Sequence, residues 1–346
     1  MQFFEQLIGT QTGLVLAFVA TATVVVLAGI RLSIYGDALG DRTGLGNGLV
    51  GLVFLAGVTS LPELVVSLTS VLNATELAQG ADLATGNMLG SNVFNLLILA
   101  FMALLFPAKF KPQEMDDPHT DSALYGLLML GLFSIAYLAS NWGNWLVPGL
   151  DCTVPVLALP VAYSFILLRE HRQHQEADEP HLPQETELTQ TPALHFYSIL
   201  LGLCGLIIIG GIILSILGSR MALPPEQGGF GMEASLIGTL FLAISTSLPE
   251  LVISFASIRM GFLDMAVGNV LGSNMFNLLI IFVADIAMRK ESLLEHASPS
   301  HWTSVALILL LTFLGGALLR TRSRKAATPV AVIMIGLYIA AMLLFM

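Results

Sequence analysis

Long apolar segments, each able to cross a lipid bilayer, constrain this chain more than any other feature. A spanning α-helix needs about 18–20 mostly apolar residues, and ten segments of the sequence fit that length. We predict spans at residues 12–35, 46–73, 82–106, 122–141, 147–168, 195–217, 232–259, 263–287, 302–320 and 328–346. Continuous runs of this kind argue against a β-barrel, whose strands alternate over short stretches. The predicted fold class is an all-α polytopic membrane protein with ten transmembrane helices.

The composition agrees with that class. Only 11% of the residues are charged and 55% are hydrophobic, whereas soluble domains carry about 25% charged residues. The net charge of −10 says little about partners, because the acidic residues are concentrated in the predicted loops. Cys152 and Cys204 lie in or beside apolar segments, which favours small packing side chains over a disulfide or metal site.

One polar stretch divides the chain into two halves. It runs from Arg169 to about Gln190 and contains Pro180, Pro183 and six acidic residues, a composition typical of a solvated linker. We predict a first membrane repeat over 1–168, a polar cytoplasmic linker over 169–194, and a second membrane repeat over 195–346. Each half holds five spans, an odd number, so the second half enters the membrane from the opposite side. The sequence therefore predicts two inverted five-helix repeats, an architecture of many secondary transporters.

Basic residues predict the orientation, because cytoplasmic connections are enriched in Lys and Arg. An external N-terminus puts eleven basic residues on the inside and three on the outside. The inside set is Arg31, Arg42, Lys109, Lys111, Arg169, Arg172, Arg259, Arg320, Arg322, Arg324 and Lys325, and the outside set is Arg220, Arg289 and Lys290. We expect both termini on the extracytoplasmic side.

A polar motif is written twice within these apolar segments, over 58–95 and over 245–277. The first copy contains Thr59-Ser60-Leu61-Pro62-Glu63 and Gly86-Asn87-Met88-Leu89-Gly90-Ser91-Asn92-Val93-Phe94-Asn95. The second contains Thr246-Ser247-Leu248-Pro249-Glu250 and Gly268-Asn269-Val270-Leu271-Gly272-Ser273-Asn274-Met275-Phe276-Asn277. Hydroxyl, amide and carboxylate groups recur at helical spacing, so each copy presents a polar stripe. Oxygen donors of this kind suit Ca²⁺, Na⁺ or Mg²⁺ rather than zinc or copper.

Each copy also places a proline and a glutamate together. A proline in mid-span removes a backbone donor, so Pro62 and Pro249 are expected to kink their helices and free carbonyls at 55–58 and 242–245 for a cation. An ionisable group at the bilayer centre costs at least about 2.5–3.5 kcal/mol, and a functional role is its default interpretation. Two glutamates sharing one site need a counter-charge, which Ca²⁺, Na⁺ or protons would supply. We predict that Glu63 and Glu250 converge between the two halves.

Other residues of the motifs have simpler interpretations. Gly86, Gly90, Gly268 and Gly272 are expected to allow close helix packing. Asn92 and Asn274 lie off the main stripe and are expected to bond between helices. Asp82 and Asp264 are interpreted as acids at helix N-termini, and Asp285 as a residue near the interface.

The two motifs closely resemble the α-repeats of the Ca²⁺/cation antiporter superfamily, in particular the compact prokaryotic type of the sodium/calcium exchanger family. The resemblance implies Na⁺-driven Ca²⁺ transport by alternating access, with no cofactor, in the plasma (inner) membrane and with a monomer sufficient for transport. It makes Glu63 and Glu250 the central Ca²⁺ carboxylates. It implies backbone carbonyls from Thr59, Thr246, Ala56 and Ala243, Na⁺ ligands from Ser60, Ser247, Ser91 and Ser273, and further ligands from Asn95 and Asn277. Val58 and Ser245 replace the family's usual glycine.

Three alternatives remain at this point. A carboxylate pair can also carry protons, so Ca²⁺/H⁺ exchange or K⁺-dependent Na⁺/Ca²⁺ exchange is possible within transporters. A Ca²⁺-permeable channel is the alternative from another class. An enzyme is a distant third, because the sequence contains no HExxH zinc motif or nucleotide-binding loop, and we predict no catalytic residues.

Overall fold

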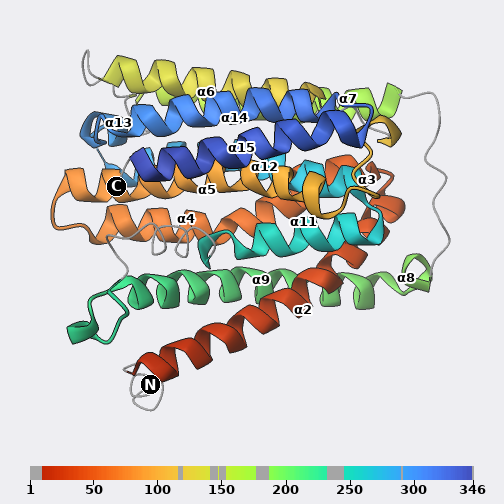
Figure 1. Cartoon of the computed structure of the whole chain (residues 1–346), viewed down its shortest axis with the longest axis horizontal. Coiled ribbons are helices and arrows are strands. Elements are labelled where there is room, and N and C mark those ends of the chain that lie inside the picture. Colours follow the sequence, from red (N-terminus) through yellow and green to blue (C-terminus); the bar gives the residue numbers. More distant parts are fainter. Residues whose placement is uncertain are drawn as a thin grey trace.

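The computed structural model describes residues 10–115, 120–140, 147, 153–176, 187–231, 245–289 and 291–344. Every regular element in these ranges is a helix, and the long helices lie side by side in one bundle (Figure 1). The predicted all-α class is therefore confirmed.

The long helices are α2 (Gln11–Thr43), α4 (Ala56–Asn73), α5 (Leu77–Leu105), α6 (Thr120–Ser140), α7 (Ala158–Glu176), α9 (Ala193–Ala222), α11 (Leu248–Met260), α12 (Leu263–Met288), α14 (His301–Leu319) and α15 (Arg324–Leu344). The short helices are α3 (Gly46–Leu49), α8 (Glu187–Gln190) and α13 (Leu293–His296). The 3₁₀ turns are η2 (Pro112–Glu114), η3 (Pro155–Leu157) and η4 (Pro225–Gln227), and η1 (Val50–Leu55) is a π-helical turn between α3 and α4.

Eight helical segments within the described ranges are long and apolar enough to cross a membrane. They are Gln11–Thr43, Gly46–Asn73, Leu77–Leu105, Asp121–Ser140, Ala193–Met221, Leu263–Met288, His301–Leu319 and Arg324–Leu344, and each overlaps a predicted span. The spans predicted at 147–168 and 232–259 are not among them. Residues 148–152 and 232–244 lie outside the described ranges, so the ten-span count stays a prediction.

The end of the predicted fifth span is wrong. Helix α7 continues past residue 168 to Glu176, into the stretch predicted as linker. Residues 169–176 are Arg, Glu, His and Gln only, and this stretch lacks glycine and proline, the two residues that most disfavour a helix interior. The helix can therefore continue where the apolar run ends. The short α8 also lies within the predicted linker, while residues 177–186 lie outside the described ranges.

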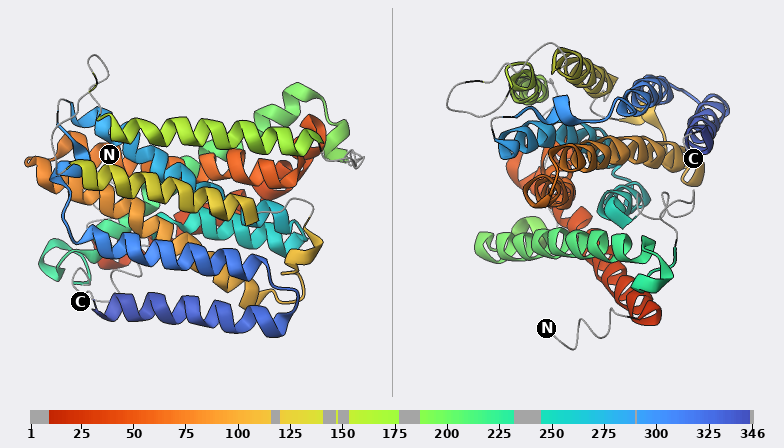
Figure 2. Two further views of the ribbon diagram at one scale, coloured as in Figure 1. Left: turned by 90° about the horizontal axis from the view of Figure 1, so that it is seen from above. Right: turned by 90° about the vertical axis from the view of Figure 1, so that its left-hand side faces the viewer.

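Helices α5 and α12 occupy the middle of the bundle (Figures 1 and 2). They pack against each other, with α4 and α11 beside them. Helices α2 and α9 pack together on one side, and α6, α7, α14 and α15 lie on the other. Peripheral helices expose large apolar side chains, such as Leu16 of α2 and Leu201 of α9, as a lipid-facing surface requires.

The two halves approach each other closely where α3 and η1 cross α12. A Cβ atom added to Gly272 would lie 2.0 Å from the Leu52 carbonyl oxygen, and one added to Gly268 would lie 2.6 Å from the Gly48 carbonyl oxygen. Only glycine permits such an approach of two backbones. The predicted close-packing role is thus confirmed for Gly268 and Gly272.

The matching glycines of α5 differ. A Cβ atom on Gly86 would make an ordinary contact of 3.4 Å with the His301 ring, and no described atom lies within 4 Å of one on Gly90. The prediction that Gly86 allows close helix packing is therefore wrong as far as the described contacts show. At Gly90 it stays a prediction.

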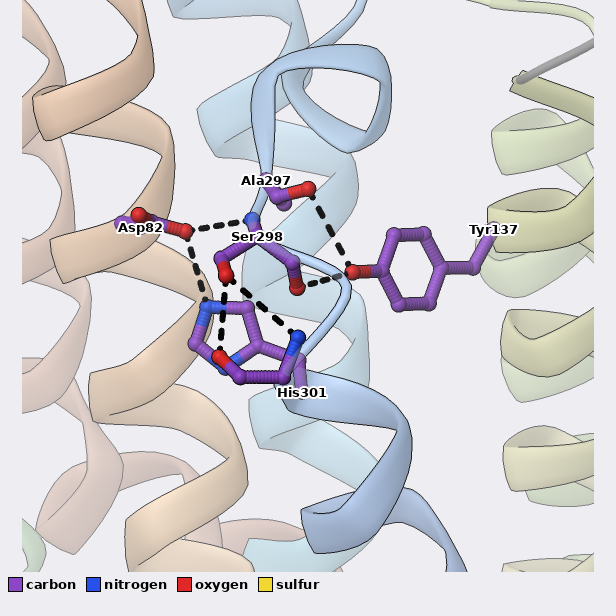
Figure 3. A network of polar contacts seen from close by, with 6 residues as sticks. Asp82, Tyr137, Ala297, Ser298 and His301 are labelled. Atoms are coloured by element: carbon purple, nitrogen blue, oxygen red, sulfur yellow. Dashed lines mark hydrogen bonds and ion pairs between the residues drawn. The ribbon is translucent and has the colours of Figure 1, made fainter.

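A polar network fastens the connection between α13 and α14 to α5 and α6 (Figure 3). One Asp82 carboxylate oxygen accepts a hydrogen bond from the Ser298 backbone N–H and lies 3.1 Å from His301 Nε2. The Tyr137 hydroxyl of α6 donates to the Ser298 carbonyl oxygen. The interpretation of Asp82 as an acid at the start of its helix is wrong, because α5 already begins at Leu77. Asp264 does lie in the first turn of α12.

The start of α2 and the end of α15 lie at the same end of the bundle (Figure 1). Basic residues predicted to face inside make contacts near the other end. Lys109 Nζ donates to the Arg259 carbonyl oxygen at 2.6 Å, and the Arg42 guanidinium donates to the Thr189 carbonyl oxygen at 3.0 Å beside α8.

Candidate cation site

The first copy of the motif lies on α4, in the middle of the helical segment Gly46–Asn73. The Thr59 and Ser60 side chains are fully buried, and Glu63, one turn further on, is 1% exposed. The segment remains helical through Pro62, and the irregular backbone lies earlier, in the π-helical turn η1. The Ala56 carbonyl oxygen, one of those expected to be freed, accepts a hydrogen bond from the Thr59 hydroxyl at 3.3 Å.

The second copy has a different backbone. Ser245 and Thr246 form a helical turn, Ser247 interrupts it with φ −99° and ψ 21°, and α11 begins at the next residue. Pro249 therefore lies in the first turn of a helix, where its missing N–H costs nothing. The interruption at Ser247, two residues before Pro249, agrees with the expected break of the helix by this proline. Glu250 is 0% exposed and also lies in this first turn, where the helix dipole favours a negative charge.

Hydroxyl groups of one half meet polar groups of the other. The Ser60 Oγ donates to Glu250 Oε1 at 3.5 Å, Ser247 Oγ donates to Ser91 Oγ at 3.4 Å, and Thr59 Oγ1 lies 3.3 Å from Ser273 Oγ. All of these side chains are buried. The structure thus brings together residues that are more than 150 positions apart in the sequence.

The carboxylates of the two glutamates are poorly satisfied by hydrogen bonds within the described part of the chain. Ser91 and Ser247 are close to the Glu63 carboxylate, but neither makes a hydrogen bond of normal geometry with it. Both Glu63 carboxylate oxygens lack a partner among the residues that the structure describes. Glu250 Oε2 also lacks one. The two carboxylates are close enough to repel each other when charged. A buried carboxylate without a partner is costly, so this pair fits a cation or protons.

Two further asparagines hold the glutamate backbones. Asn87 Nδ2 donates to the Glu63 carbonyl oxygen at 3.3 Å and to Ser67 Oγ at 3.1 Å. The second copy repeats this pattern, from Asn269 Nδ2 to the Glu250 carbonyl oxygen at 3.4 Å and to Ser254 Oγ at 2.9 Å. These bonds fix α4 against α5, and α11 against α12, at the level of the carboxylates.

The asparagines off the main stripe do bond between helices, as expected. Asn92 Nδ2 donates to the Asn274 carbonyl oxygen at 3.3 Å, and Asn274 Nδ2 donates to the Asn92 carbonyl oxygen at 3.2 Å. Asn95 and Asn277 are both fully buried. Of the remaining predicted ligands, Thr246 is only half-buried and Ala243 lies outside the described ranges.

Asp285 has a role that the sequence did not indicate. It is 0% exposed, and its carboxylate accepts hydrogen bonds from the Thr153 backbone N–H at 2.8 Å, the Thr153 hydroxyl at 3.1 Å and the Leu293 backbone N–H at 2.8 Å. It anchors the segments before α7 and α13 to α12. A lone acidic residue in an apolar helix was the available signal, but its partners are two backbone N–H groups and one hydroxyl that no motif reveals.

A bundle of membrane-length helices with two unpaired carboxylates at its centre, surrounded by hydroxyls and amides, defines the class of ion transporters. A family model described as sodium/calcium exchanger protein matches residues 13–168 and 196–346, and the chain belongs to this family. It is therefore an integral membrane protein of a cation antiporter family, and that family consists of exchangers rather than enzymes. Ca²⁺ and Na⁺ are the ions that the family exchanges.

Individual relatives agree with this assignment. The putative antiporter CaxA of Alkalimonas amylolytica is 30% identical over 271 residues, which are 75% of this chain and 78% of the relative. The sodium/calcium exchanger MaX1 of Methanosarcina acetivorans is 25% identical over 277 residues, 71% of this chain and 74% of the relative. The solved structure of the sodium-calcium exchanger NCX_Mj matches with a TM-score of 0.65 and 19% identity, covering 95% of this chain and 97% of that chain.

Proposed function

We propose that this protein exchanges Ca²⁺ for Na⁺ by alternating access, through one site between Glu63 and Glu250. The observation that carries the proposal is the pair of buried carboxylates, one from each half of the chain, with three of their four oxygens lacking a hydrogen-bond partner among the described residues. The proposal that Na⁺ is the counter-ion is supported by the family description and by the relative named a sodium/calcium exchanger.

The charge of the site explains why transport would be an exchange. Two buried carboxylates that repel each other are stable only with a counter-charge. One Ca²⁺ neutralises both, and so do Na⁺ ions. A change of conformation by the empty carrier would expose two uncompensated charges to the bilayer interior. The free energy of that exposure is too high for the step to occur. The carrier therefore crosses only when it is loaded.

The proposed ligands are those predicted from the sequence. They are the carboxylates of Glu63 and Glu250, the carbonyls of Thr59, Thr246, Ala56 and Ala243, the hydroxyls of Ser60, Ser247, Ser91 and Ser273, and the amides of Asn95 and Asn277. The contacts between Ser60 and Glu250 and between Thr59 and Ser273 support a common site. All donors are oxygens, as Ca²⁺ and Na⁺ require.

We also propose that the halves 1–168 and 195–346 are inverted repeats. Matched residues make matched bonds, as a two-fold axis would produce. Asn92 and Asn274 bond reciprocally, and Asn87 and Asn269 hold the two glutamate carbonyls in the same way. The positive-inside bias further supports extracytoplasmic termini and a cytoplasmic linker. We place the protein in a prokaryotic inner membrane, with the single chain as the transporting unit.

The decisive experiment is ⁴⁵Ca²⁺ uptake into vesicles containing the purified protein, with Na⁺, K⁺ and H⁺ gradients imposed one at a time. We expect saturable uptake that requires Na⁺ inside the vesicles and is abolished when the Na⁺ gradient is dissipated. Uptake that follows a pH gradient and ignores Na⁺ would instead establish Ca²⁺/H⁺ exchange. Flux that needs no counter-ion and does not saturate would establish a channel.

A change at Asn277 tests how ligand charge sets the coupling. Asn277→Asp adds a carboxylate to the site, which must then be neutralised by an additional Na⁺ or a proton. We expect transport currents to change their pH dependence or their Na⁺:Ca²⁺ ratio. The same substitution at the matching residue, Asn95→Asp, is the comparison. Currents of Asn277→Asp that equal those of the wild type at every pH contradict the expectation.

A further inference from the structure

Two asparagine side chains, Asn92 and Asn277, and the backbone carbonyl of Asn274 form a hydrogen-bonded chain across the interface of α5 and α12. Asn92 of α5 donates through Nδ2 to the Asn274 carbonyl oxygen at 3.3 Å. Its other end, Oδ1, accepts a hydrogen bond from Asn277 Nδ2 at 3.0 Å. Asn277 lies one helical turn after Ser273, whose hydroxyl meets Thr59 in the cation site.

The direction of this chain follows from its first member. A backbone carbonyl can only accept, so the Asn92 amide must turn its NH₂ group toward Asn274 and its oxygen toward Asn277. Asn277 must then turn its own NH₂ group toward Asn92. Its Oδ1 atom is left pointing the other way, fully buried and without a hydrogen-bond partner.

Among the described residues, the matching asparagines do not form an equivalent arrangement around Asn95. Asn274 makes the matching bond to the Asn92 carbonyl oxygen at 3.2 Å, but its Oδ1 atom has no partner. Neither end of the Asn95 amide has one either. Nothing among the described contacts therefore fixes which end of the Asn95 amide faces the site.

We propose that Asn92 is a positioning residue for ion selectivity: it holds the Asn277 amide with its oxygen presented as a cation ligand. A fixed oxygen needs no reorientation when a cation binds, whereas an amide free to rotate can present its NH₂ group, which repels cations. Asn277 and Asn95 are thus unequal ligands despite their matching places. This inference rests on the proposed function, since it assigns a specificity role within the same site.

The test measures Ca²⁺ and Na⁺ binding to the purified protein by titration calorimetry, so that it does not depend on transport or on the counter-ion. Asn277→Ala identifies the ion that this residue serves. For that ion, Asn92→Ala is expected to weaken binding about fivefold, the size of one net hydrogen bond. The double variant should bind no more weakly than Asn277→Ala alone, because the two residues act in series.

Asn274→Ala is the matched control. It removes the reciprocal interhelical bond, as Asn92→Ala does, but it keeps the Asn274 backbone carbonyl and therefore the chain to Asn277. We expect Asn92→Ala to lower the thermal midpoint at least as much as Asn274→Ala, because it removes two hydrogen bonds rather than one, while Asn274→Ala binds the ion within about twofold of wild type. A double variant of Asn92→Ala with Asn95→Ala should show multiplied effects.

Four results would overturn the inference. Two concern single variants: Asn277→Ala binds both ions normally, or folded Asn92→Ala binds normally. Two concern comparisons: the losses of affinity multiply in the Asn92/Asn277 double variant, or Asn92→Ala and Asn274→Ala lose equal affinity. Failure of the proposed exchange is a separate outcome. It would appear as absent Na⁺-dependent ⁴⁵Ca²⁺ uptake by the wild type, while the binding comparison is still decided.

Discussion

Glu63→Gln and Glu250→Gln are each expected to reduce ⁴⁵Ca²⁺ uptake by about 100-fold or more. Removing one partner of a buried charge pair costs about 3–5 kcal/mol, and each 1.4 kcal/mol is a factor of ten in affinity. Both carboxylates are buried, and neither forms an ion pair with a basic side chain in the part of the chain that the structure describes. A bound cation would be the principal partner lost.

The control for these variants is Glu295→Gln, the same chemical change on the exposed surface of α13, which should transport like the wild type. Glutamine keeps the size and polarity of glutamate, so size-exclusion profiles should show that all three variants remain folded. Wild-type uptake by folded Glu63→Gln or Glu250→Gln would show that the central site lies elsewhere.

Gly272→Ala is expected to destabilise the fold although it adds one methyl group. That methyl group would lie 2.0 Å from the Leu52 carbonyl oxygen, so the backbones of η1 and α12 would have to separate. Overpacking typically costs about 1–3 kcal/mol, and the neighbour here is backbone, which cannot rotate away. We expect a lower thermal midpoint and a smaller folded fraction, measured by thermal unfolding and fluorescence-detected size-exclusion chromatography.

Gly336→Ala is the matched substitution on α15, where no described atom lies within 4 Å of the added carbon. It should leave the thermal midpoint unchanged or raise it, because alanine favours a helix more than glycine does. Equal midpoints for the two variants would mean that α12 and η1 are not in close contact in the membrane.

Much of the helical layout could be predicted from the sequence, because the thickness of the hydrocarbon core sets the length of an apolar run. Predictions of helix ends failed outside the apolar runs, where the bilayer thickness no longer sets the length of a helix. Helix α7 extends to Glu176 because helix propensity continues beyond the apolar run. Helix α5 starts at Leu77, so Asp82 lies within the helix and not at its terminus as predicted. Its side chain contacts Ser298 and His301.

The site was predictable as a set of residues but not as an arrangement. Burial of Glu63, Glu250 and their neighbouring hydroxyls follows from a polar stripe repeated in two apolar segments. The orientation of the Asn277 amide does not, because it depends on groups brought together only by the packing of distant helices. The interruption at Ser247 was indicated by Pro249, but its exact position was not. The same proline motif gives a continuous helix in one copy and a helix start in the other.

The π-helical turn η1 sets the rotational phase of everything that follows it on the same segment. Each residue of a regular α-helix advances by about 100° around the axis, and a π-helical turn accommodates one additional residue. If Val50–Leu55 were one residue shorter, the Glu63 side chain would be rotated by about 100° around the helix axis. That rotation is measured relative to the surface of the same segment that packs against Gly268 and Gly272 of α12. The irregular turn thus allows one rigid segment to satisfy two angular requirements, a backbone contact at one level and a carboxylate at another.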